Sequence, residues 1–204
     1  MNRAVQPWRR TPSRDLLVGS VHEVAPRVLN LLLQVRGRVG RIVEVEAYGG
    51  ADDPASHAAR GPTTRNSTMF ASAGLLYVYR SYGLHWCANV VTGVEGEASA
   101  VLVRAVEPVD GVEQMRRDRP RARRDADLTN GPGKLCAALG IHAGHDGVDL
   151  LDPSAAAVLL DDGIPPPRRP EVTGRVGISK AVGRPWRFCV PGNPWVSSGR
   201  PSGD

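Results

Sequence analysis

The sequence predicts an α+β fold: a single domain with a mixed, largely antiparallel β-sheet, surrounding helices and a protruding β-hairpin. Segments with strand and helix patterns alternate irregularly, which favours this class over a regular β–α repeat. The 204 residues are enough for one well-packed domain, and neither a repeat nor a linker divides them. We therefore expect one domain over residues 15–197, a flexible basic arm over 1–14 and a loose tail over 198–204.

The first expected elements are a helix and two strands. Ser20 and Glu23 fit a capping box, in which the Ser20 side chain begins a helix that runs to about Leu29. Residues 31–35 and 39–47 follow with strand patterns.

The second of these strands ends in two acids, Glu44 and Glu46. Strict alternation along a strand puts Glu46 on the same face as Ile42. A carboxylate beside a residue of the buried type, at the end of a strand, lies either at the lip of the sheet or in a functional site.

A β-hairpin is expected next. Two β-rich runs, at residues 75–81 and 84–91, flank a short turn that begins at Tyr82. Alternation puts Tyr77 and Tyr79 on one face of the hairpin. Tyr82 is expected at the tip, away from either packed face.

The rest of the chain carries two helix patterns and three strand patterns. They are a strand over 100–106, helices over 110–117 and 130–139, and strands over 172–178 and 186–190. We expect Asp110 to cap the first of these helices, and Pro132 suits the first turn of the second. Arg104 interrupts an apolar strand, and a buried arginine must be paired. Its expected partner is Glu46 or Glu44.

Composition narrows the class of protein. The net charge is +5 and the pI is near 9.6, which favours polyanions such as nucleic acid but also fits a merely basic protein. The three cysteines lack C-x-x-C spacing, which indicates buried thiols in a reducing compartment. No apolar run approaches the roughly 20 residues of a membrane span, and no secretory signal is evident. We expect a cytoplasmic protein.

Several segments, taken together, resemble a known enzyme family. They are EVEAY (44–48), HAARGPTTRN (57–66), LYVYRSYG (76–83), CAN (87–89), VLVRAVEP (101–108), NGPGKLCAALGI (130–141), RVGIS (175–179) and WRFCVPGNPWVS (186–197). In this order they resemble the alkyladenine (3-methyladenine) DNA glycosylase family, the monofunctional enzymes of base excision repair, and point to a bacterial member. One segment alone would be weak, but their succession over residues 15–197 is specific.

The resemblance implies hydrolysis with one essential carboxylate. It places the general base at Glu46, which would accept a proton from the water that attacks the anomeric carbon. Glu44, two residues away, is a rival by chemistry alone. Arg104 is implied to hold the carboxylate and the water, with help from the backbone carbonyl of Val176. An arginine partner would also keep Glu46 ionised at neutral pH.

The resemblance also implies a pocket for a flipped base, with Glu46 at its mouth. The pocket residues are Tyr48, His57, Tyr79, Asn89 and Leu102. Aromatic walls favour electron-poor, positively charged alkylated purines. Asn89 is implied to exclude guanine by a clash with its 2-amino group. Without the resemblance, Tyr79 fits a core tyrosine and His57 a solvent-facing loop histidine equally well.

Contacts to DNA are implied at further positions. Tyr82 matches the family's intercalating residue, which fills the gap that an extruded nucleotide leaves in the base stack. Contacts to the DNA backbone are implied for Arg65, Gly131, Gly133, Lys134 and Lys180. Next to the intercalating residue, Leu84 and His85 depart from the pattern usual in vertebrate relatives.

The expected partner is double-stranded DNA that contains alkylated bases, bound by a monomer in the cytoplasm at the nucleoid. No cofactor and no metal is expected, and no lysine lies near Glu46 to support a lyase step. Two rivals stay open. Asp52, Asp53 and His57 with Glu46 would be the ligands of a metal-dependent nuclease, although their spacing matches no known geometry. Alternatively, the chain binds damaged DNA without catalysis.

Overall fold

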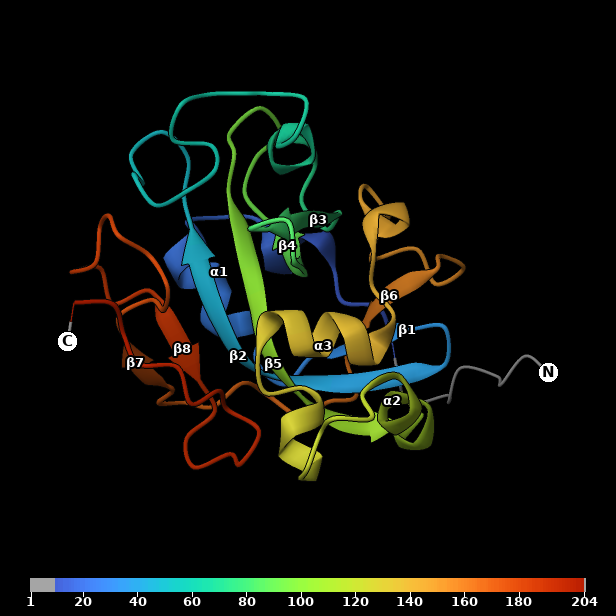
Figure 1. The fold of residues 1–204 in the computed structure, drawn as a ribbon. Helices are drawn as coiled ribbons and strands as arrows, with labels where there is room; N and C mark the ends of the chain where they lie inside the picture. Colours follow the sequence, from blue (N-terminus) through green and yellow to red (C-terminus); the bar gives the residue numbers. More distant parts are fainter. Residues whose placement is uncertain (1–9, 204) are drawn as a thin grey trace.

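One curled antiparallel sheet organises the chain (Figure 1). The computed structural model describes residues 10–203. The strands are β1 (Leu32–Val35), β2 (Arg38–Tyr48), β3 (Leu76–Ser81), β4 (His85–Val91), β5 (Ala100–Asp110), β6 (Ala157–Leu160), β7 (Glu171–Thr173) and β8 (Arg187–Cys189). Their order is β3-β4-β5-β2-β1-β6, and β8, which pairs with β7, joins the side of β2. Every pairing between these strands is antiparallel, and the predicted α+β class is confirmed.

Short helices connect and cover the strands. The α-helices are α1 (Val21–Val28), α2 (Val112–Asp118) and α3 (Pro132–Leu139), and 3-10 turns span Arg14–Leu17, Ser67–Phe70, Asp125–Leu128 and Ala143–His145. In Figure 1, α3 crosses in front of β5, whereas α1 lies behind β2. Each of the described helices is too short to cross a bilayer.

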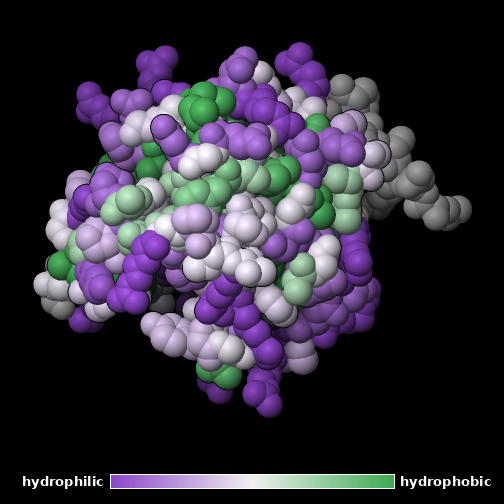
Figure 2. All heavy atoms as spheres, turned by 90° about the horizontal axis from the view of Figure 1, so that it is seen from above, coloured by the Kyte–Doolittle hydropathy of each residue, from purple (hydrophilic) through white to green (hydrophobic). Residues whose placement is uncertain are grey.

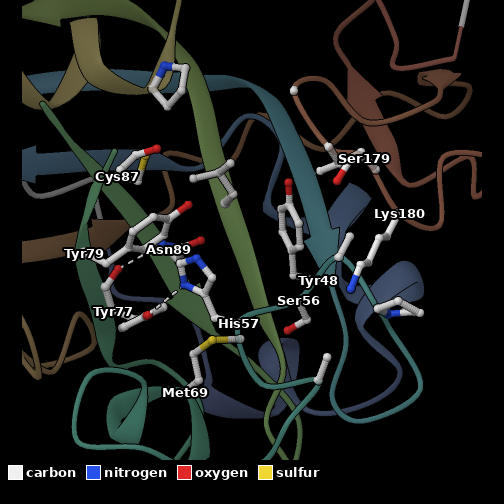
Figure 3. A pocket seen from close by; sticks show the side chains of 18 of the residues that line it. Tyr48, Ser56, His57, Met69, Tyr77, Tyr79, Cys87, Asn89, Ser179 and Lys180 are labelled. Carbon is white, nitrogen blue, oxygen red and sulfur yellow. Dashed lines mark hydrogen bonds between the residues drawn. The ribbon is translucent and has the colours of Figure 1, made fainter. Parts of the chain in front are cut away.

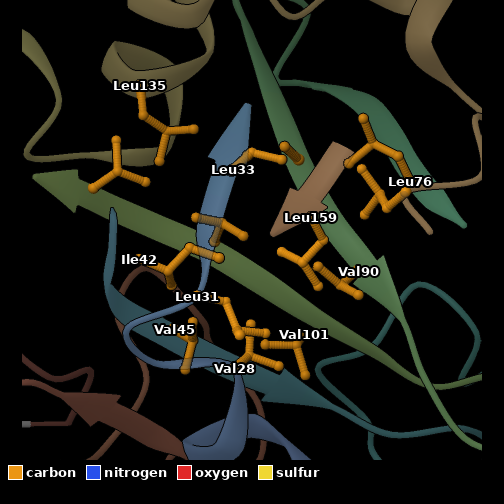
Figure 4. Close-up of a cluster of buried hydrophobic side chains, with 14 of the residues drawn as sticks. Val28, Leu31, Leu33, Ile42, Val45, Leu76, Val90, Val101, Leu135 and Leu159 are labelled. Atoms are coloured by element: carbon orange, nitrogen blue, oxygen red, sulfur yellow. The ribbon is translucent and has the colours of Figure 1, made fainter. Parts of the chain in front are cut away.

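The main hydrophobic core lies where these helices meet the curled sheet. Val28 of α1 and Leu135 of α3 belong to the same buried cluster as Ile42 and Val45 of β2 and Val101 of β5 (Figure 4). Burying a side chain of this size contributes about 1.5–3 kcal/mol. The core therefore fixes β2 and β5, the two central strands that carry the expected acids and arginine.

The register of β2 against β5 shifts at three places, and two of these shifts are β-bulges on either side of Glu44. The extra residue of the first bulge is Val43 on β2, and the extra residue of the second is Arg104 on β5. A bulge shifts the alternation of side chains by one residue, so Glu44 and Glu46 turn away from the cluster that contains Ile42. The expectation that Glu46 shares a face with Ile42 is therefore wrong. The second bulge aims Arg104 at the two acids.

The predicted start of α1 at Ser20 is confirmed, but its capping box and the predicted cap at Asp110 are wrong. Ser20 is the N-cap of α1, but its hydroxyl bonds to the His22 ring and not to a backbone N–H group of the helix. Asp110 is the last residue of β5, and Gly111, in the left-handed region at φ 73°, begins α2 instead. A glycine in this conformation lets the chain turn sharply from strand to helix without steric cost.

The C-terminal third differs most from expectation. Strand β6 was not predicted, and of the expected strand 172–178 only Val172 and Thr173 lie in β7. The expected arm over 1–14 falls largely outside the described residues, although Arg10 pairs with Asp161 through the backbone. The tail is less loose than expected, because the Ser202 hydroxyl accepts a hydrogen bond from Ile178 N–H at 3.0 Å.

A buried ion pair ties the segment after β2 to the segment after β7. Arg175 donates to both carboxylate oxygens of Asp53, at 2.6 and 2.8 Å, and to the carbonyl oxygen of Ala47 at 2.9 Å. Both charged side chains are fully buried. Burial would raise the pKa of Asp53, but hydrogen bonds from Arg175 and from Gly49 N–H outweigh it and lower the pKa.

Replacing one member of this pair should destabilise the fold strongly. Asp53→Asn leaves Arg175 buried with an uncompensated charge, and we expect a loss of about 3–5 kcal/mol in the free energy of unfolding. Urea titration of the wild-type and variant proteins measures it.

The neighbouring Asp52→Asn is the matched control. The Asp52 side chain is 80% exposed and lies 3.8 Å from Arg184, so its loss should cost about 1 kcal/mol or less. Equal, small losses for both variants would contradict the role given to the buried pair.

Candidate active site

A cavity of about 990 Å³ opens between the β3–β4 hairpin, residues 54–60 after β2, and residues 176–180 (Figure 3). Ten of the residues singled out by the sequence line it: Tyr48, His57, Arg65, Tyr79, Tyr82, Asn89, Leu102, Arg104, Val176 and Lys180. Four others do not: Glu46, Gly131, Gly133 and Lys134. The structure thus gathers residues from four separate parts of the chain around one space.

The sheet itself supplies a row of site residues. Tyr77 on β3 pairs with Asn89 on β4, Asn89 pairs with Leu102 on β5, and Leu102 pairs with Glu46 on β2. Residues opposite one another on adjacent strands lie on the same face of a sheet. Strand pairing therefore places Glu46 in one row with Leu102 and Asn89, which line the cavity.

Aromatic rings stand on both sides of the cavity. In Figure 3, Tyr48 faces His57 and Tyr79 across the open space. The His57 and Tyr79 rings meet edge to face, with centroids 4.3 Å apart, and His57 Nδ1 lies 3.1 Å from the Tyr77 hydroxyl. Burial and the positive charge of Arg65 lower the pKa of His57, so its ring is neutral at physiological pH. A flat ligand would fit between such walls.

Tyr77 was not among the predicted pocket residues. It lines the cavity, is almost fully buried and orients the His57 ring. Its backbone carbonyl also accepts a hydrogen bond from the Asn89 side chain at 3.1 Å. The signal in the sequence was its alternation with Tyr79, which puts both rings on one face.

Glu46 lies directly behind the cavity wall. It is fully buried, and its hydrogen-bond donors Tyr48 and Val176 and its ion-pair partner Arg104 line the cavity in its place. Oε1 accepts from Val176 N–H at 2.7 Å and lies 3.2 Å from Arg104 Nη1. Oε2 accepts from the Tyr48 hydroxyl at 2.9 Å. The expectation that Glu46 lies at the mouth of the cavity is therefore wrong, because its three partners lie between the carboxylate and the open space.

The charge state of Glu46 reflects a balance of burial and partners. Burial raises the pKa of Glu46, and Arg104, the Val176 N–H group and the Tyr48 hydroxyl lower it without cancelling the rise. Arg104 therefore offsets only part of the effect of burial on the pKa of Glu46. A raised pKa suits a group that accepts a proton near neutral pH.

Glu44 has different partners and a different environment. It accepts from Arg104 Nε at 2.8 Å, from Arg187 Nε at 2.7 Å and from Ser197 N–H at 2.6 Å. Burial would raise the pKa of Glu44, but these cations and the Ser197 N–H group lower it. Neither Arg187 nor Ser197 lines the cavity. Glu44 is therefore held by structural contacts, and Glu46 is the nearer of the two acids to the cavity.

The hairpin tip stands in solvent at the rim of the cavity. Tyr82 is 91% exposed and has φ 48°, and Leu84 beside it is 71% exposed. Helix α3 packs against the tip end of the hairpin at His85. A Cβ atom at Gly133 would lie 2.8 Å from the Cβ of His85, so only glycine permits this approach. The turn is thus held from one side by α3, while the Tyr82 side chain is free to meet a partner.

Cationic side chains surround the opening. Arg65 donates to the Arg80 carbonyl at 2.9 Å and lies over the Tyr79 ring at 5.9 Å, and Lys180 stands beside Tyr48 (Figure 3). Lys134, near the start of α3, bonds to the Asn130 side chain at 2.7 Å. Seen from above, hydrophilic side chains lie mostly around the edge of this face, with a paler, partly hydrophobic band across its middle (Figure 2). The cations beside the opening are suited to a polyanion.

The acids proposed for a nuclease metal site do not converge. Asp53 is bound to Arg175, and Asp52 is exposed beside Arg184. Within residues 10–203, no three His, Cys, Asp or Glu side chains are grouped so that they could hold a metal ion.

Comparison with known proteins assigns the family. A sequence model described as methylpurine-DNA glycosylase (MPG) matches residues 15–194. A putative 3-methyladenine DNA glycosylase of Burkholderia orbicola (strain MC0-3) is 47% identical over 202 residues, which is 98% of each chain. A protein of the same name from Nocardia farcinica (strain IFM 10152) is 50% identical, covering 93% of this chain and 92% of the relative. The chain belongs to the methylpurine-DNA glycosylase family.

Proposed function

We propose that this chain hydrolyses the N-glycosidic bond of alkylated purines, such as 3-methyladenine, in duplex DNA, with Glu46 as the general base. Family membership makes it a hydrolytic DNA glycosylase of base excision repair. The observation that carries the role of Glu46 is its position: a buried carboxylate, held by Arg104 and Val176 immediately behind a cavity walled with aromatic rings.

The proposed reaction needs little help for the leaving group. An alkylated purine already carries positive charge, so it departs as a neutral base once the bond to C1′ breaks. Glu46 accepts a proton from water as the water attacks C1′. Arg104 and the backbone of Val176 position the carboxylate and the water. The products are a free base and an abasic site, without a lyase step.

The cavity supplies recognition of the base. The flipped purine would stack between Tyr48 on one side and the His57 and Tyr79 rings on the other, and positively charged purines are favoured by such faces. Asn89, fixed by its hydrogen bond to the Tyr77 carbonyl, and Leu102 form the floor. A 2-amino group on guanine would meet Asn89, which excludes the normal base.

The DNA duplex would lie across the rim. Tyr82 inserts into the stack in place of the flipped nucleotide. Backbone phosphates would contact Arg65, Lys180 and the start of α3 at Gly131, Gly133 and Lys134. We further propose that the chain acts as a monomer on nucleoid DNA in the cytoplasm, and that residues 15–197 form the glycosylase domain, flanked by accessory segments at 1–14 and 198–204.

Glu46→Gln should abolish base release and leave DNA binding nearly intact. The amide cannot accept a proton from water, so we expect the single-turnover rate on alkylated duplex to fall by at least about 10²–10⁴-fold. The assay runs in EDTA, which would silence a metal-dependent nuclease. Affinity for the lesion duplex should change by only a few-fold.

The exposed Glu23 provides the matched control, since Glu23→Gln makes the same chemical change far from the cavity. It should keep full activity. Base release by Glu46→Gln at the wild-type rate would refute the proposed base.

The dependence of the single-turnover rate on pH should reflect the raised pKa of Glu46. Burial raises the pKa of Glu46 above its ordinary value, and the carboxylate is the active form. The rate should therefore be full above the raised pKa and be lost as pH falls through it, which gives the profile an acidic limb. Single-turnover rates across the acidic range locate this limb, and a midpoint at or below the ordinary glutamate pKa of about 4.3 would contradict the assignment.

Tyr82→Ala should weaken binding to lesion-containing duplex by roughly 5- to 100-fold, because stacking of a base on an aromatic ring is worth about 1–3 kcal/mol. Fluorescence anisotropy measures the affinity. Tyr82→Phe retains the ring and should restore most of it. An unchanged affinity of Tyr82→Ala for the lesion duplex would contradict the proposal that Tyr82 intercalates.

A further inference from the structure

The contact between Tyr48 and Glu46 joins the two halves of the site. Both residues follow the first bulge on β2, two positions apart, and so share one face of the strand. The Tyr48 ring lines the cavity, and its hydroxyl donates to Oε2 of Glu46 at 2.9 Å. One side chain therefore touches both the space for the base and the acid behind it.

The Tyr48 hydroxyl and the Val176 N–H group bond to different oxygens of Glu46. Oε1 already accepts from the Val176 N–H group and lies beside Arg104. Oε2 has the Tyr48 hydroxyl as its hydrogen-bond donor. A carboxylate oxygen has two acceptor positions, so Oε2 can take a water proton while it keeps the bond from Tyr48.

The ring is fixed by a second contact. The guanidinium of Arg175, itself held by Asp53, lies over the Tyr48 ring at 4.7 Å. This cation–π contact covers one face of the ring. Burial and the neighbouring Glu46 charge raise the pKa of Tyr48, so the hydroxyl stays protonated and is a permanent donor.

We propose that the Tyr48 hydroxyl is a positioning group for Glu46, which orients Oε2 toward water in the cavity while the same ring forms a wall for the base. This inference rests on the proposed function of Glu46. It assigns Tyr48 two separable tasks, because the ring and the hydroxyl can be tested independently.

Tyr48→Phe keeps the ring and removes the donor. We expect the maximal single-turnover rate on alkylated duplex to fall roughly 10- to 100-fold, the equivalent of losing a hydrogen bond to a charged group. Affinity for the lesion duplex should stay within about twofold, because the aromatic wall is retained. The acidic limb should move to higher pH, because a carboxylate that loses a donor is easier to protonate.

The groups that face Glu46 directly do not titrate on this limb, whereas His57, on the cavity wall, has a lowered pKa and titrates in the acidic range as well. The titratable or charged side chains that face Glu46 are Arg104, Glu44, Tyr48, Tyr79, Cys87 and, opposite it on β8, Arg187. Burial raises the pKa of Tyr79 and Cys87, and the arginines stay charged. The pKa of Glu44 is lowered, so Glu44 titrates below Glu46.

Tyr79→Phe is the matched comparison, since it removes a hydroxyl from the opposite wall of the cavity. That hydroxyl interacts with Cys87, and its loss should leave the acidic limb where it is in the wild type, whatever the effect on the rate. If Tyr48→Phe fails to fold, 3-fluorotyrosine at position 48 replaces it. This stronger donor should move the limb to lower pH.

Two results would overturn the inference. One is a wild-type rate and limb for Tyr48→Phe while Glu46→Gln is inactive. The other is an acidic limb at the wild-type pH, either in Tyr48→Phe with a reduced rate or in the 3-fluorotyrosine variant. Such a result would make Tyr48 merely structural. Activity in Glu46→Gln would instead contradict the proposed role of Glu46. Failure of the proposed function and failure of the inference about Tyr48 are therefore distinguishable.

Discussion

The whole site depends on a single arginine placed between two buried carboxylates. Arg104 lies 2.8 Å from Glu44 and 3.2 Å from Glu46, and all three side chains are buried. Two acids this close would not both ionise without the cation, because like charges in a low-dielectric interior repel strongly. The arginine, in turn, is stable there only because both acids face it. Each group makes the burial of the others possible.

The same cluster divides the acids into two roles. Glu44 gains a second arginine and two hydrogen bonds from Ser197, and its pKa falls, whereas Glu46 faces the cavity side with one arginine, and its pKa rises. Two chemically identical side chains thus differ by environment alone, a pattern found where one group serves structure and the other proton transfer. Sequence chemistry left them as rivals, and only their contacts distinguish them.

Patterns in the sequence predicted what depends on local order. Strands β1 to β5, the hairpin with Tyr82 at its exposed tip, and the ion pairing of Arg104 follow from alternation and burial. The face of Glu46 could not be predicted, because a bulge at Val43 shifts the alternation and leaves no mark in composition. The covering of Glu46 and the role of Tyr77 depend on partners far along the chain, such as Val176 and His57. Long-range contacts of this kind are invisible to local pattern.

Burial of the acid is consistent with the chemistry proposed for it. When the bond to a cationic purine breaks, positive charge moves from the base to the sugar, and a nearby carboxylate stabilises that charge most where water is excluded. An acid open to solvent would be screened at this moment. A fully desolvated one without partners would bind a proton and lose its charge. Hydrogen bonds from Tyr48 and the Val176 N–H group, together with Arg104, hold Glu46 between these extremes. The ring-lined cavity and the acid therefore act together: the rings keep bulk solvent away from the carboxylate while the attacking water is admitted, and the carboxylate stabilises the positive charge that develops on the sugar.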